Sequence, residues 1–349
     1  MKKVSKILGR IFLAILILIA LALIICFFHL KSAQKKDREL LEKDGFINLV
    51  SAGDYHMNIN IFGEGKYPII AMPGSGDSEF PAGMKLFSEY LDDDISLVVV
   101  SRPGYDLCEE TNHEITTEYV VESTRTALKN AGIETPYVLM PHSMSGIYAT
   151  YWENTYPDEI SGVIFLDSIN SAEKETEIPG FSKFLFKVFQ FFGKAGVSRA
   201  VTDIAGIDTE DVYGSYQADA NALSGVNVTP ASKCYFSELM NFNSNMKTAW
   251  ASISSNDIPK VYISTNFSSV EDAKEYLMYV YDEADEEEAK RRFEDEQSEE
   301  QTEYRKKRSE YIESLGNCKE INIPGSHFIY EQKPDACAEA ITEFMNALN

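Results

Sequence analysis

A serine at the junction of an apolar segment and an expected helix is the residue of this chain best suited to act as a nucleophile. Residues 140–147 read Met-Pro-His-Ser-Met-Ser-Gly-Ile, and Ser143 directly follows the apolar segment 137–140. A serine on such a sharp strand-to-helix turn is strained, and its hydroxyl stands clear of the backbone at the end of the sheet. The flanking positions must be compact, and here they hold Pro141 and Ser145 where the common pattern has two glycines. The simpler alternative is a serine that caps the helix.

A histidine near the end of the chain is the candidate base for this serine. His327 lies in the segment Ile321-Asn-Ile-Pro-Gly-Ser-His, just past an expected strand. A hydroxyl is a poor nucleophile until a base takes its proton, and imidazole has a suitable pKa for that role. The backbone N–H of Met144 can hold the negative oxygen that forms, and the N-terminus of the helix adds a positive dipole end. The alternative is a loop histidine whose ring is satisfied by the backbone.

The elements that must position these residues alternate between strand and helix. Apolar runs predict strands at 67–72, 95–100, 137–140, 160–167 and 258–265, and helical spacing predicts helices at 116–131 and 336–348. This alternation predicts a mostly parallel sheet with helices on both faces. Ligands of such sheets bind beyond the carboxyl ends of the strands, where Ser143 and His327 both fall.

With these elements in order, the chain resembles the α/β-hydrolase superfamily, in particular its capped members of the proline-iminopeptidase, epoxide-hydrolase and lipase or esterase type. The resemblance covers residues 46–169 and 258–349. It rests on five motifs in family order, which are Gly74-Ser-Gly, Arg102-Pro-Gly-Tyr, His142-Ser-Met-Ser-Gly, Tyr156-Pro-Asp-Glu-Ile and Pro324-Gly-Ser-His. The resemblance implies a Ser143–His327 catalytic pair and an oxyanion hole formed by the N–H groups of Met144 and Ser75.

The acidic member of the catalytic triad is the open point of this resemblance. In most relatives it follows the strand that here ends near Ser264, but the segment 265–269 reads Thr-Asn-Phe-Ser-Ser and contains no carboxylate. Asp167, at the end of the strand after the serine helix, occupies a place that some lipases of the superfamily use. We favour Asp167 and keep Glu271 and Asp272 as alternatives.

Two insertions are expected within the hydrolase core. Residues 170–257 are too many for a simple connection and predict a helical cap. Within it, six apolar residues recur at helical spacing and form one face, which are Phe181, Phe184, Leu185, Val188, Phe189 and Phe192. We expect this face to pack against the core, and the alternative is an acyl-binding wall over Ser143. Residues 271–313 predict an acidic, solvated helical excursion.

The N-terminal segment predicts a membrane anchor. Residues 1–10 form a basic tail, and 11–30 form an apolar span that contains an uncharged run, Ile11–Phe28. Its length suits a bilayer, and it lacks the small-residue cleavage site of a signal peptide. We therefore expect a permanent single-pass helix with a cytoplasmic N-terminus, a charged tether at 31–45 and an extracytoplasmic catalytic domain.

Composition narrows the remaining functions. The chain has 349 residues and a net charge of −23, which disfavours nucleic acid as a partner. Its motifs imply no metal and no cofactor. We expect a membrane-anchored serine hydrolase that cleaves the carboxylic ester of a small acyl substrate. The alternatives are an amide or peptide hydrolase of the same fold and a catalytically inactive relative that binds a ligand. The sequence identifies no protein partner.

Overall fold

One eight-stranded sheet organises the molecule in a computed structural model that describes residues 2–169, 180–205 and 212–348. The strands lie in the order β1-β2-β4-β3-β5-β6-β7-β8. Pairs β1–β2 and β2–β4 are antiparallel, and all the later pairs are parallel, as the sequence predicts. Their bounds are β1 Leu49–Ser51, β2 His56–Phe62, β3 Tyr67–Met72, β4 Ile95–Val100, β5 Tyr137–Pro141, β6 Ile160–Leu166, β7 Asn256–Ser264 and β8 Gly316–Asn322.

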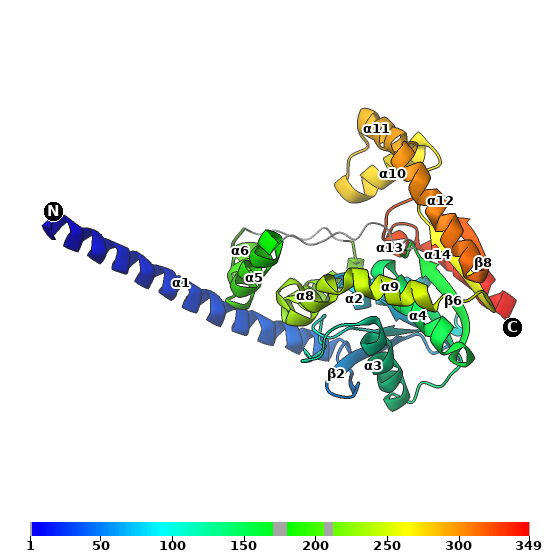
Figure 1. Cartoon of the computed structure of the whole chain (residues 1–349), viewed down its shortest axis with the longest axis horizontal. Helices are drawn as coiled ribbons and strands as arrows, with labels where there is room; N and C mark the ends of the chain where they lie inside the picture. Colours follow the sequence, from blue (N-terminus) through cyan, green and yellow to red (C-terminus); the bar gives the residue numbers. More distant parts are fainter. Residues whose placement is uncertain (1, 170–179, 206–211, 349) are drawn as a thin grey trace.

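Helices cover both faces of this sheet because successive strand residues point to opposite sides. On one face, Val98 and Val100 join a core with α3 (Thr117–Asn130), α4 (Gly146–Thr155) and α9 (Phe242–Ser252). On the other face, Leu97 and Val99 pack with α2 (Phe80–Phe87), α13 (Ile329–Gln332) and α14 (Pro334–Leu348). The predicted fold class is therefore confirmed (Figure 1).

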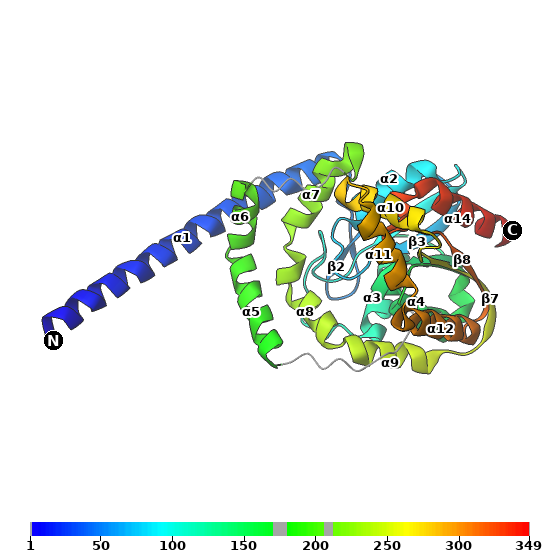
Figure 2. The same cartoon turned by 90° about the horizontal axis from the view of Figure 1, so that it is seen from above.

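The two long segments that flank β7 are helical. Between β6 and β7 lie α5 (Gly180–Lys194), α6 (Val197–Ala205), α7 (Gln217–Val226), α8 (Lys233–Met240) and α9. Between β7 and β8 lie α10 (Val270–Tyr281), α11 (Glu286–Glu296) and α12 (Glu299–Ser314). In Figures 1 and 2, α5 and α6 lie beside α1, apart from the sheet, whereas α9 runs along the sheet-covering helices. Part of the expected cap therefore belongs to the core packing.

The N-terminal helix differs from the expected tether. Helix α1 runs without interruption from Lys2 to Lys43, so the segment 31–43 continues it. That segment contains no glycine or proline to break the helix, and the first such residue, Gly45, has φ +80°. The last turns of α1 also pack on the domain, since Leu41 is fully buried in a cluster with Leu223 of α7. The C-terminal end of α1 is thus packed against the domain (Figure 2).

Candidate active site

Ser143 lies on a strained turn between β5 and α4. Its φ is +53°, in the left-handed region that side chains other than glycine rarely adopt. The short 3₁₀ turn Ser143–Ser145 leads directly into α4. A Cβ added at Gly146 would approach the Ser168 side chain to 2.8 Å, so the glycine required by close packing stands one place after the usual position. This geometry explains how the motif tolerates Ser145.

His327 and Asp167 are directly paired. His327 Nδ1 donates to Asp167 Oδ2 across 2.7 Å, which fixes the other ring nitrogen as a proton acceptor. Asp167 follows β6 with φ +36°, and it also accepts a hydrogen bond of 3.0 Å from the hydroxyl of Thr265. Thr265 follows β7, the position where the resemblance leads us to expect the acid. It donates instead to Asp167, the acid at the end of the neighbouring strand β6.

The two alternative acids lie elsewhere. Glu271 and Asp272 are in the first turn of α10, where Glu271 faces Lys274 at 3.5 Å. Asp272 accepts hydrogen bonds from the backbone of Ser268 at 2.8 Å and from the hydroxyl of Ser269 at 3.0 Å. Both carboxylates are thus occupied at the helix N-terminus, and the His327 ring is paired with Asp167.

A cavity of about 950 Å³ brings the sequence-predicted residues together. It is lined by Ser75, Ser143, Met144, Asp167, Ser168, Ile169, Gly180, Lys183, Leu239, Met240, Phe242, Asn243, Tyr304 and His327. Within the described residues, no hydrogen bond joins the Ser143 hydroxyl to His327. Such catalytic hydrogen bonds are commonly long without substrate and tighten in the complex. The mixture of apolar walls and a few polar groups suits a small organic ligand.

A buried arginine holds the turn that carries Ser75. Arg102 donates to the carbonyl oxygens of Pro73 and Gly74, at 2.7 and 2.6 Å, and to the Ser145 hydroxyl at 2.7 Å. The Ser145 hydroxyl in turn donates to the Pro73 carbonyl at 2.5 Å. Ser145 therefore fastens the serine turn to the turn after β3, a connection that a glycine could not make.

Glu238 of α8 completes this network from another part of the chain. Its carboxylate pairs with Arg102 at 2.7 Å and accepts hydrogen bonds from the hydroxyls of Tyr105 and Tyr148, both at 2.5 Å. Both charged side chains of the pair are almost wholly buried. Sequence reasoning identified the Arg102 turn by resemblance but missed Glu238, because one acidic residue in a helical segment has no distinguishing signal.

Comparison with solved structures identifies the architecture. An esterase from Thermogutta terrifontis is similar with a TM-score of 0.53 and 12% identity, over 86% of this chain and 98% of that one. A bromoperoxidase from Bacillus anthracis gives 0.53 and 14%, over 86% and 99%. The haloalkane dehalogenase DatA from Agrobacterium tumefaciens C58 gives 0.54 and 14%, over 86% and 96%. This chain has the α/β-hydrolase fold.

Sequence comparison adds relatives but no activity. No family model matches the chain. An uncharacterized Bacillus subtilis protein is 34% identical over 168 residues, which are 48% of this chain and 51% of that protein. An uncharacterized Schizosaccharomyces pombe protein is 27% identical over 129 residues, 36% of this chain and 24% of that protein. The chain thus matches about half or less of the length of these relatives. The α/β-hydrolase fold hosts several chemistries, so the site residues must carry the functional argument.

Behind the candidate nucleophile of this α/β-hydrolase fold lies a buried group of ionisable side chains. Burial, together with the neighbouring His327, lowers the pKa of His142 to about 3, so this ring is neutral. Its Nε2 donates to the His327 backbone carbonyl at 2.9 Å, which makes His142 a support beneath the turn. Burial and the nearby Glu79 raise the pKa of Asp77 to about 7. Burial and Asp77 raise the pKa of Glu331 to about 8.

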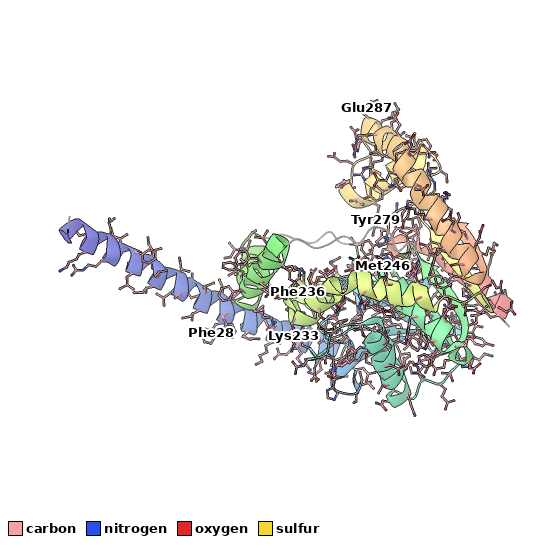
Figure 3. All side chains as sticks on the ribbon, viewed as in Figure 1. Phe28, Lys233, Phe236, Met246, Tyr279 and Glu287 are labelled. Atoms are coloured by element: carbon pink, nitrogen blue, oxygen red, sulfur yellow. The ribbon has the colours of Figure 1, made fainter. Side chains whose placement is uncertain are left out.

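The phenylalanine face of α5 does not pack as expected. Phe184, Leu185, Phe189 and Phe192 are 60%, 49%, 51% and 43% exposed, and none of them lines the Ser143 cavity. The side chain of Phe181 lies outside the described residues. The expected packing against the hydrolase core is therefore wrong, because α5 lies away from the sheet and contacts α8 through Phe186 instead. The rings of Phe186 and Phe236 stack with centroids 4.7 Å apart, and Figure 3 labels Phe236 on α8.

Proposed function

We propose that this protein is a membrane-anchored serine hydrolase that cleaves a carboxylic ester through an acyl-enzyme. The observation that carries the proposal is the 2.7 Å pairing of His327 with Asp167, in a cavity that Ser143 also lines. The left-handed φ of Ser143 gives further support, since strained residues cluster at active sites. The α/β-hydrolase fold is consistent with a hydrolytic activity.

The proposed reaction uses only groups of this chain and water. Ser143 Oγ bonds to the ester carbonyl carbon while His327 Nε2 takes its proton, and Asp167 stabilises the imidazolium that forms. The N–H groups of Met144 and Ser75 receive the negative oxygen. The bond to the leaving alcohol then breaks, and the alcohol oxygen takes the proton from His327. In the second half, His327 takes a proton from a water molecule as its oxygen bonds to the acyl carbon. The bond to Ser143 Oγ then breaks, His327 returns the proton to that oxygen, and the acid leaves.

A fluorophosphonate probe and a short-chain p-nitrophenyl ester test this proposal. Such a probe phosphonylates only an activated serine, so the full-length protein should be labelled and Ser143→Ala should not. Ser309→Ala, on the exposed face of α12, is the matched control and should label normally. Undiminished ester turnover by Ser143→Ala would refute the proposal. Comparison with the matched p-nitroanilide separates ester from amide hydrolysis.

The anchor is part of the same proposal. Among the described residues, α1 is the one helix long and apolar enough to cross a membrane, and its apolar side chains are exposed. We place the basic N-terminal tail in the cytoplasm and the catalytic domain outside it. The protein should stay in carbonate-washed membranes, and protease added to intact cells or protoplasts should reach the catalytic domain. A mature N-terminus beyond Leu30 would contradict the anchor.

A further inference from the structure

Helix α5 has an unusual composition for this chain. It reads GFSKFLFKVFQFFGK, with three lysines and no acidic residue, although the whole protein carries a net charge of −23. Lys183 and Lys187 are exposed and lie one turn apart. Phe184, Leu185 and the neighbouring phenylalanines are also largely exposed. An amphipathic helix with lysine on its polar face and phenylalanine or leucine on the other is typical of segments that lie in a membrane interface.

Helix α6 extends this apolar surface. Val201 is 56% exposed and Ile204 is 87% exposed. Together with Phe184, Leu185, Phe189, Phe191 and Phe192, these residues form a surface that we call the α5–α6 apolar face. Exposed apolar side chains gathered on two neighbouring helices indicate an interaction site.

Contacts with α1 fix the position of this face along the membrane helix. A Cβ at Gly196, between α5 and α6, would lie 2.3 Å from the Cys26 carbonyl oxygen and 2.8 Å from Leu30. Only glycine permits this close approach of the two backbones. On α6, Asp203 pairs with His29 at 2.7 Å. The α5–α6 pair is therefore fastened to the end of the apolar run of α1.

A second ion pair also joins α6 to α1. Arg199 of α6 pairs with Asp37 of α1 at 2.7 Å, about three helical turns beyond Cys26. Because α1 is continuous through this region, the two ion pairs, Asp203–His29 and Arg199–Asp37, together fix the position of α6 along α1. Figures 1 and 2 both show α5 and α6 (green) beside the middle of α1, between its free N-terminal part and the rest of the domain. Figure 3 places Phe28 on α1 in this same region.

The bilayer is the occupant that these observations favour. The apolar surface of α1 ends at Phe28, next to Gly196, so the α5–α6 apolar face continues the surface that is already taken to contact lipid. Lysines on α5 suit the lipid headgroups, whereas the acidic surface elsewhere is repelled by them. An apolar face that lies beside the end of the apolar run of α1 and is flanked by lysines is expected at the boundary between the lipid headgroups and the acyl chains.

The same helix reaches the candidate active site. Gly180 and Lys183, at the start of α5, line the cavity that holds Ser143. A second cavity, of about 640 Å³, lies under the α5–α6 pair and is lined by Phe189, Arg199 and Gly76. Gly76 belongs to the turn that carries Ser75. Both cavities thus connect the α5–α6 pair to the groups proposed to perform the reaction.

We propose that the α5–α6 apolar face is embedded in the bilayer interface and that the substrate is a lipid-phase ester, whose acyl chain reaches Ser143 from the membrane. This inference rests on the proposed function, because it assumes the membrane helix and the nucleophile. It adds an attachment surface to the anchor and assigns the substrate class. An ester dissolved in water is then a poorer substrate than the same chemistry presented in a bilayer.

Depth-dependent fluorescence quenching tests the attachment. The full-length protein is reconstituted in phosphatidylcholine vesicles with and without brominated acyl chains, and its own two tryptophans supply a constant background. Phe191→Trp and Ile204→Trp should each add fluorescence that brominated lipid quenches. The matched control is Tyr281→Trp, since Tyr281 is 55% exposed at the end of α10. Figures 1 and 2 show that α10 lies farther from the N-terminus of α1 than α5 and α6 do. Quenching equal to that of the control would overturn the proposal.

Activity on two substrates tests the substrate class. The double variant Phe191→Ser, Phe192→Ser should lose turnover of a fluorogenic palmitoyl ester held in vesicles by about tenfold or more, the ratio that burial of one phenylalanine side chain represents. Its turnover of p-nitrophenyl acetate in water should be unchanged, as should both activities of Tyr281→Ser. Equal activity of the double variant on the vesicle ester would overturn the proposed route. Ester turnover that survives Ser143→Ala refutes the proposed catalytic mechanism, whereas the quenching result does not depend on the identity of the nucleophile.

Discussion

The candidate triad shows how single residues divide their roles. Asp167 is held by its own turn and by Thr265, and it orients His327 through a 2.7 Å hydrogen bond. Such an acid keeps the imidazole in the correct tautomer and stabilises its charged form. The effect of its removal is therefore a measure of the proposed mechanism.

We expect Asp167→Asn to reduce kcat by about 10⁴, as removal of the orienting acid does in a Ser-His-Asp triad. The amide keeps the shape of the side chain but favours the wrong tautomer of His327. Glu271→Gln and Asp272→Asn are the controls and should retain normal kcat, because α10 occupies both carboxylates. Steady-state kinetics with a p-nitrophenyl ester provides the measurement, and the opposite ranking would move the acid to α10.

Backbone strain at Ser143 gives a second prediction at this scale. A side chain at φ +53° costs about 1–3 kcal/mol, and glycine avoids most of that cost. Ser143→Gly should therefore raise the midpoint of thermal unfolding above that of Ser143→Ala, while both variants are inactive. Intrinsic tryptophan fluorescence in detergent can follow the transition, since Trp152 is fully buried. A lower midpoint for the glycine variant would show that the turn is unstrained.

The sequence predicts much of this site because its chemistry is local. Ser143 and His327 each lie in a motif of a few residues, and Asp167 directly ends an apolar strand. The hydrogen bond from Thr265 to Asp167 was not predicted, because it joins positions 98 residues apart. Glu238 was missed for the same reason, since its partners Arg102 and Tyr148 lie on other elements. Side-chain networks between elements leave no periodic pattern in a sequence.

Among the elements, α8 has an influence beyond its eight residues. It places Glu238 beside Arg102, and Arg102 holds the carbonyl groups of the turn that carries Ser75. Removing one partner of a buried ion pair costs about 3–5 kcal/mol, since a charge is left uncompensated.

Glu238→Gln should accordingly lower the thermal midpoint and reduce kcat, with a smaller effect on KM, because the turn that carries Ser75 loses its support. The carboxamide preserves the size of the side chain. Tyr148→Phe removes one hydrogen bond to Glu238 but leaves the ion pair, so its effects should be clearly smaller. If kcat of Glu238→Gln equals that of the unaltered protein, α8 has no positioning role in the reaction.

The elements themselves were predicted unequally. Buried parallel strands such as β4 and β6 are nearly continuous apolar runs and were easily recognised. The apolar face of α5 was correctly predicted to be helical. Periodicity alone, however, does not say whether such a face packs against protein or contacts lipid. Likewise, the charged end of α1 was expected to be a tether. Its packing was missed because the residues that it contacts, on α6 and α7, lie far along the chain.

The whole molecule carries a pH dependence of stability through its buried carboxyls. The pKa of Glu331 is about 8 in the folded protein against an ordinary 4.5, and that of Asp77 is about 7 against 3.8. A group whose pKa rises on folding binds its proton more tightly in the folded state. Its contribution is complete below the ordinary pKa and is lost as the pH rises through the folded value.

The free energy of unfolding should therefore fall as the pH rises from 7 to about 8.5. The slope is up to about 1.4 kcal/mol per pH unit for each carboxyl that still holds its proton in the folded state and has lost it in the unfolded state. His142 adds little slope there, because its folded pKa of about 3 leaves it neutral in the folded state and the unfolded side chain is mostly neutral as well. Glu331→Gln should flatten the dependence. The test is to measure the thermal midpoints of the unaltered protein and of Glu331→Gln across this pH range. If the two midpoints fall equally with pH, Glu331 is not the source of the dependence.

The packing of α1 against the domain also has a consequence for the order in which contacts can form during synthesis. Asp37 is paired with Arg199, which the ribosome adds 162 residues later. At about 5–20 residues per second, that interval is on the order of 8–30 seconds. Throughout it, the last turns of α1 have emerged without the α6 and α7 surfaces that later cover Leu41 and Asp37. For this protein, the helix that is translated first contacts α6 and α7, which are made only after more than half of the chain has been synthesised.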